Sequence, residues 1–281
     1  MPLLDAASTA AHWLWHNEAA FYIAAYTLVG CALNYLVARI PGVPKAIIGG
    51  SPAWMTLMSM AYQLAYTVMM TAGAWRAATA GTMSREWWSP EDCATAQPAP
   101  MLQAPAGGAP GAAPPGDALW WERNFLYLMC GYMIKDLFQP MSALIYAHHV
   151  FCLVGVGIFL AGSCGGLAAT STWILEVGSF AYNAWVAWPR SPAAKAFYVV
   201  VHTASNGFAV WAMTHYLPHN GFSPFGAKGW GGFSPGGVFL AVTGAGLIAV
   251  RQWECYANVL CERSSAEEDG TKATTKRRKA E

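Results

Sequence analysis

Seven stretches of about 20 residues, each dominated by apolar side chains, recur along this chain. A helix rises 1.5 Å per residue, so a stretch of this length matches the roughly 30 Å hydrocarbon core of a bilayer. The stretches are residues 19–37, 53–75, 119–138, 141–161, 167–188, 194–217 and 238–260. Only Gln139 and Pro140 separate the third from the fourth, so a single broken segment and a count of six stay open.

The composition agrees with a membrane environment. Of 281 residues, 55% are hydrophobic and 11% are charged, whereas about a quarter are charged in a soluble domain. The 14 Trp and 28 Gly are typical of membrane helices with aromatic belts. We therefore expect an all-α integral membrane protein with about seven transmembrane helices. The formal net charge of +1 gives no indication of nucleic-acid binding.

The distribution of basic residues predicts the orientation. With seven spans, the segments on the C-terminal side of the membrane carry more Lys and Arg than those on the other side, which places the C-terminus in the cytosol and the N-terminus in the lumen. The cytosolic set is Arg39, Lys45, Arg190, Lys195, Arg263, Lys272, Lys276, Arg277, Arg278 and Lys279. The first 18 residues lack Lys and Arg, so we expect no cleaved signal peptide. Lys279, third from the end, resembles an endoplasmic-reticulum retrieval signal.

Two polar segments divide the chain. Residues 89–118 are rich in Pro, Ala and Gly without a period, which predicts a disordered lumenal loop. Residues 263–281 form a charged cytosolic tail. We therefore expect an N-terminal flank with two helices over residues 1–88 and a transmembrane core over residues 119–262.

Ionisable residues inside the apolar stretches are the main indication of function. Polar groups in hydrocarbon are costly unless they face a partner or a cavity. Counting 1.5 Å per residue from the cytosolic ends gives depths of about 10 to 18 Å for most of them and about 3 Å for Asp136. The deeper groups are His148, His149, Glu176, His202 and Arg251. One shared cavity explains this layer; structural hydrogen bonds between helices are the alternative.

Helical periodicity assigns faces to these residues. Adjacent positions lie 100° apart, so one of His148 and His149 is expected to face the cavity while the other flanks it. Polar stripes at helical spacing are expected on later helices, with Arg251 and Glu254 able to neutralise each other. The stripes are Glu176, Ser179 and Asn183, then His202 and Asn206.

Three segments resemble the TLC-domain family of endoplasmic-reticulum membrane proteins. They are GYMIKDLF (residues 131–138), the LIYAHH run that ends at His149, and STWILEVGSFAYNAW (residues 171–185). The resemblance covers residues 119–260. It implies a barrel-like bundle of six helices around a lipid-sized cavity, with one further helix outside.

The resemblance also bears on activity. The ceramide synthases of this family carry a His-Asp pair ahead of the glutamate that resembles Glu176, and this chain has residues 168–172 (AATST) there instead. It is therefore more similar to the small TLC-domain-containing proteins, which implies lipid binding, trafficking or regulation of membrane lipid and sphingolipid composition. Membrane lipids are the expected partners. The expected ligand-binding residues are His148, His149, Glu176, Asn183, His202, Asn206 and Arg251.

An enzyme is the alternative. In an acyl-CoA-dependent N-acyltransferase, His148 or His149 would act as general base or nucleophile on the thioester, with Asp136 or Glu176 orienting the imidazole. Acyl-CoA would then be a co-substrate, and no other cofactor is expected. The seven cysteines form no CxxC, and no metal site is expected. His215 and His219 are interpreted as interface residues, and a Cys93–Cys164 disulfide is possible in this topology.

Overall fold

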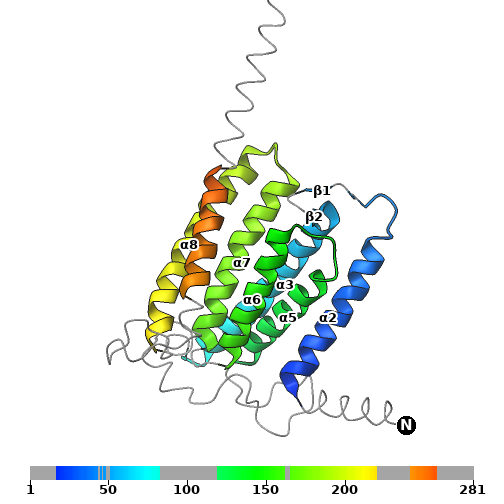
Figure 1. The fold of residues 1–281 in the computed structure, drawn as a ribbon. Helices are drawn as coiled ribbons and strands as arrows, with labels where there is room; N and C mark the ends of the chain where they lie inside the picture. The colour runs from blue at the N-terminus through cyan, green and yellow to red at the C-terminus, as the bar shows by residue number, and fades with distance from the viewer. Residues whose placement is uncertain are drawn as a thin grey trace, which may run out of the picture.

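The computed structural model describes residues 17–43, 45, 47–48, 51–82, 119–161, 165–219 and 241–257. These residues are helical except for turns and one short antiparallel pair, β1 (Ile47–Ile48) with β2 (Ser51–Pro52). The labelled helices are α2 (Glu18–Val37), α3 (Ala53–Thr79), α5 (Trp120–Asp136), α6 (Ala143–Ala161), α7 (Gly165–Ala187) and α8 (Pro192–His219). A further helix covers residues 241–257. The helices run alongside one another in a bundle (Figure 1).

Each predicted apolar stretch overlaps one of these helices. The third and fourth stretches form separate helices, α5 and α6, joined by a turn at residues 137–142. Pro140 lacks a backbone N–H and cannot continue a helix, which accounts for the break. The expectation of an all-α chain is confirmed for the described residues. Residues 89–118 and 263–281 lie outside them, as do Cys93 and Cys164 and the side chains of His215 and His219.

Local sequence signals set several helix ends. The side chain of Asn17 accepts a hydrogen bond from the backbone N–H of Ala20 at 3.0 Å and so caps α2. Ser191 does the same for α8, accepting from Ala194 at 3.2 Å, and Pro192 occupies the first helical position. After α3, Gly81 adopts a φ of 68°, a conformation that costs glycine little.

Glycines allow two pairs of helices to approach closely. A Cβ built on Gly131 of α5 would lie 2.6 Å from the Cβ of Tyr26 and 3.0 Å from the backbone N of Thr27 on α2. A Cβ on Gly178 of α7 would overlap the hydroxyl of Ser205 on α8. These contacts hold α2 against α5 at one side of the bundle and α7 against α8 at the other (Figure 1).

Apolar side chains lie both in the core of this bundle and on its outer surface. Large apolar side chains point outward; Leu28, Trp75, Phe138 and Trp253 are each more than 70% exposed. Charged and polar side chains are buried as well, alongside the apolar core. The buried set includes Glu122, Arg123, Asn124, Lys135, Asp136, His149, His202 and Asn206. Exposed apolar surface on this scale is unusual for a soluble monomer.

By length and hydropathy, α2 is the one helix among the described residues that is long and apolar enough to cross a membrane. A shorter apolar helical stretch lies at Ile145–Gly157 in α6. The remaining helices match the predicted stretches in position but do not pass this test. In α5 the reason is plain, because four of its 17 residues are charged and buried.

Candidate functional site

A polar cavity of about 280 Å³ lies within the bundle. Side chains from α3, α5, α6, α7, α8 and residues 241–257 line it, and none of its lining residues belongs to the described part of α2. The structure thus brings the predicted layer of ionisable groups to one place. The predicted residues along its wall are Asp136, His148, His149, Glu176, Asn183, His202 and Arg251.

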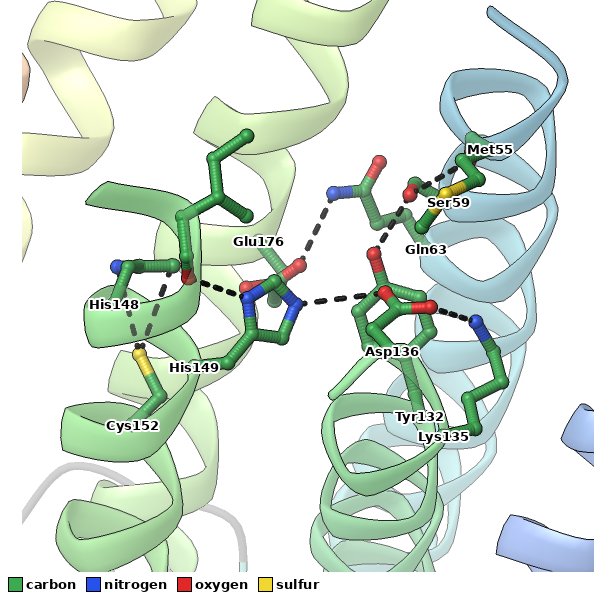
Figure 2. Close-up of polar contacts among 11 residues, drawn as sticks. Met55, Ser59, Gln63, Tyr132, Lys135, Asp136, His148, His149, Cys152 and Glu176 are labelled. Atoms are coloured by element: carbon green, nitrogen blue, oxygen red, sulfur yellow. Dashed lines mark hydrogen bonds and ion pairs between the residues drawn. The ribbon is translucent and has the colours of Figure 1, made fainter. Parts of the chain in front are cut away.

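His149 is held at both ring nitrogens. Its Nδ1 lies 2.8 Å from the backbone oxygen of Ile145 on its own helix, and its Nε2 lies 3.4 Å from Oδ2 of Asp136 on α5. Both partners offer oxygen acceptors. Figure 2 shows the ring fixed between them, so neither nitrogen is left to act on a ligand.

Lys135 is the second partner of Asp136. Its ammonium group donates to Oδ1 of Asp136 and lies 4.4 Å from the ring centroid of Tyr132 and 5.1 Å from that of Tyr62. Lys135 and Asp136 are only 1% and 2% exposed. The lysine stem needs the space at Gly30 of α2, where a Cβ would lie 2.6 Å from its Cδ. A buried pair with this many partners is expected to fix the positions of α2, α5 and α6.

His148 faces a different way. Its ring centroid is 5.7 Å from that of His149 with an interplanar angle of 86°. Its nitrogens lie 3.7 and 3.8 Å from the sulfur of Cys152, beyond the distance of a strong hydrogen bond. His148 lines the polar cavity and also the apolar cavity described below. Both histidines thus line the polar cavity, but only His148 also lines the apolar one, while both nitrogens of His149 have oxygen partners.

Glu176 belongs to a network between α3 and α7. Its Oε2 accepts from Nε2 of Gln63 at 3.1 Å, and Oε1 of Gln63 accepts from Nδ2 of Asn183 at 3.1 Å (Figure 2 shows the first contact). The predicted stripe of Glu176 and Asn183 is thus real. Gln63 was missed by sequence reasoning, although a glutamine in the middle of an apolar stretch is the same kind of signal.

Arg251 connects residues 241–257 to α7 and α8. Its guanidinium donates to the hydroxyl of Ser179 at 3.0 Å, the backbone oxygen of Leu175 at 3.1 Å and Oδ1 of Asn206 at 3.3 Å. The described contacts of Arg251 therefore lead to neighbouring helices, and they include no ion pair with Glu254 at bonding distance.

Asn206 and His202 differ from one another in position. Asn206 does not line the polar cavity. Its Oδ1 accepts a hydrogen bond from Nε of Arg251, and its Nδ2 donates to Oε1 of Gln252 at 2.9 Å. Contact between Asn206 and a ligand therefore stays a prediction, and the contacts shown give this residue a part in positioning Arg251. His202 does line the cavity, with Nδ1 3.1 Å from the backbone oxygen of Gly178.

An apolar cavity of about 150 Å³ adjoins the polar one. His148, Glu176, Leu247 and Arg251 line both cavities, and we call these four residues the junction. From the junction the apolar cavity continues between α6, α7, α8 and residues 241–257. The arrangement can receive a molecule that has a polar part and an apolar part.

Within the described residues, no group of three or more His, Cys, Asp or Glu side chains is arranged to hold a metal ion. The four cysteines described, Cys31, Cys130, Cys152 and Cys255, are free thiols. No family model, no curated protein and no solved structure matches this chain.

Proposed function

We propose that this chain is a multi-pass membrane protein of the TLC-domain type that binds and handles lipids in an intramembrane cavity. The observation that carries the proposal is the junction, where a wall of charged and hydrogen-bonding side chains meets an apolar cavity inside a bundle with an apolar outer surface. A lipid has the same division between a polar group and a hydrocarbon chain. Small-molecule sites are commonly apolar with a few placed polar groups.

The membrane setting is supported by the distribution of polarity. Exposed Leu, Val and Trp side chains are costly in water but favourable against hydrocarbon, and ionisable groups in membrane bundles face the interior, as they do here. The length and hydropathy of α2 agree with this setting. The lining of the cavity by six helical segments, with α2 to one side, is compatible with the barrel and outer helix that the TLC resemblance implies.

The proposed orientation places the C-terminus in the cytosol and the N-terminus in the lumen of the endoplasmic reticulum. An epitope tag after Glu281 should then be reached by antibody when only the plasma membrane is permeabilised. A tag that becomes reachable only after the internal membranes are opened would reverse the orientation.

The lipid-handling role is tested by a lipid profile of cells lacking the protein, rescued with wild type or with variants of α6. We expect His148→Ala to lose the rescue while the protein level stays near that of wild type, because this side chain makes few strong contacts. Tyr146→Ala, on the outer face of the same helix, is the matched control. Full rescue by His148→Ala would show that His148, and with it the junction as proposed, is not needed for lipid handling.

Acyl transfer is the second candidate, because His148 lines both cavities and its nitrogens make only long contacts, of 3.7 and 3.8 Å, with the sulfur of Cys152. The imidazole lone pair would attack the carbonyl of an acyl thioester and expel the CoA thiolate. An amine would then displace the imidazole, its proton passing to the thiolate. Purified protein given acyl-CoA with a sphingoid base or a lysolipid tests this reaction. Retained lipid without loss of thioester would reject acyl transfer to those acceptors and leave lipid handling in place.

A further inference from the structure

The shape of the two cavities bears on which lipid they accept, an inference that rests on the proposed lipid-handling function. The polar cavity, at about 280 Å³, is nearly twice as large as the apolar one, at about 150 Å³. Amide, carboxylate, imidazole and guanidinium groups share the wall of the polar cavity with Met, Tyr and aliphatic side chains, whereas the wall of the apolar cavity is almost entirely hydrocarbon. A ligand that fills both therefore has a sizeable polar group and a modest apolar part.

The apolar cavity extends along the axis of the bundle from the junction. On three different helices, the lining residue farthest from the junction lies eight positions from His148, Glu176 or Arg251. These distal residues are Val156, Ala168 and Thr243. Eight residues at 1.5 Å each give the apolar cavity a length of about 12 Å.

Small side chains make room at the distal end. Ala168 of α7 and Ala212 of α8 line the cavity there and are each 1% exposed. Gly244 lines it from the helix at residues 241–257, and a Cβ at this position would lie 2.7 Å from Cε of Met213. A larger side chain at Ala168 or Ala212 would occupy space that the cavity now leaves empty, and one at Gly244 would push against Met213, which also lines the cavity.

We propose that the two cavities form one site for a single-chain amphiphile, with the head of the ligand at the junction and its chain in the apolar cavity, and that Ala168, Ala212 and Gly244 set the length of chain accepted. An extended chain advances about 1.25 Å per carbon, so 12 Å accommodates roughly ten methylenes. A volume of about 150 Å³ for the apolar cavity suits one chain rather than two.

The junction also specifies the chemistry next to the chain. Glu176 offers carboxylate oxygens as acceptors, and Arg251 offers guanidinium N–H groups as donors. A ligand that both donates and accepts hydrogen bonds at the root of its chain, such as an amide or a hydroxyl, satisfies both. Glu176 already accepts from Gln63, and Arg251 already donates to Ser179, Leu175 and Asn206, so such a ligand would use the lone pairs and N–H groups that these contacts leave over.

The test is a competition among chain lengths. The purified full-length protein is incubated with an equimolar mixture of lysophosphatidylcholines whose saturated chains run from octanoyl to palmitoyl. Retained lipid is then identified by native mass spectrometry. We expect wild type to favour chains near decanoyl and to discriminate against palmitoyl by roughly tenfold, because the excess methylenes find no space.

Two variants and one control examine the distal end. Ala168→Leu and Ala212→Leu lie on different helices, and each should shift the preferred chain to about two or three methylenes shorter, since leucine extends by that length. Ala204→Leu, an equal increase in size on the exposed face of α8, should leave the preference unchanged.

The outcomes separate this inference from the proposed function. Retention of no lipid by wild type would overturn lipid handling itself. Retention without a preference among chain lengths, or a preference unmoved in whichever of the two variants folds, would overturn the length limit and leave lipid handling standing. If neither variant folds, the discrimination shown by wild type decides the question by its presence or absence.

Discussion

Neutralising Asp136 should destabilise this protein more than any other single polar change in the site. Its carboxylate lies between the ammonium of Lys135 and the Nε2 of His149, and both Lys135 and Asp136 are almost fully buried. In Asp136→Asn the side chain keeps its shape but loses its charge. Lys135 then has no carboxylate partner among the described residues, where its other neighbours include Cys31 and the rings of Tyr62 and Tyr132.

The magnitude follows from the burial of the pair. Removing one partner of a buried ion pair costs about 3 to 5 kcal/mol, whereas replacing both partners by neutral groups of similar volume is often close to neutral. Thermal midpoints fall by about 2 to 4 °C per kcal/mol for chains of 150–250 residues, so Asp136→Asn should lower Tm by roughly 6 to 20 °C. The double variant Lys135→Met, Asp136→Asn should recover most of this loss, since methionine retains the lysine stem.

The assay is thermal unfolding of the purified protein in one detergent, with wild type, both single variants and the double variant measured side by side. The four midpoints form a double-mutant cycle whose interaction energy isolates the pair. A Tm for Asp136→Asn within about 2 °C of wild type would refute the reasoning, as would additive losses in the double variant.

Two further predictions concern packing and the network around Glu176. Gly131→Ala should destabilise by about 1 to 3 kcal/mol because its Cβ would lie 2.6 Å from that of Tyr26, while Gly157→Ala, with nothing within 4 Å, should be neutral or stabilise by up to about 1 kcal/mol in the same unfolding assay. Equal effects at the two glycines would contradict the close approach of α2 and α5. Gln63→Ala should cost about 1 to 3 kcal/mol, since Glu176 and Asn183 both lose their partner, whereas Leu64→Ala on the exposed face of α3 should cost less.

The positions of the helices could be predicted from the sequence because they depend on a coarse property, the length of each apolar stretch. The grouping of Glu176, His202 and Arg251 could be predicted as well, since equal depth on several helices brings side chains into one layer. The hydrogen-bond partners of these residues could not be predicted from the sequence. Gln63 reaches Glu176 only because α3 packs beside α7, and neighbouring helices are not fixed by helix length.

Asn206 and the apolar cavity show a second limit. Asn206 lies one turn from His202 on the expected face, yet the guanidinium of Arg251 stands between it and the cavity. Whether a residue on this face reaches the cavity depends on the length of its side chain and of its neighbours' side chains, and helical periodicity gives no information about those lengths. The position of the apolar cavity could not be predicted from the sequence. Alanine and glycine occur both beside cavities and where helices pack closely, so these residues alone do not indicate empty space.

The adjacent residues His148 and His149 have different partners because they point in different directions from the same helix. The 100° between neighbouring positions turns His149 toward α5, where Asp136 and the carbonyl of Ile145 occupy both nitrogens, and turns His148 toward the junction. Fixing His149 to Asp136 also fixes the rotation of α6, because Asp136 is itself held by Lys135. The contacts among Lys135, Asp136 and His149 therefore position the imidazole of His148 without touching it. A variant of Asp136 or Lys135 should disturb lipid binding through the placement of His148, even though neither residue need contact the lipid.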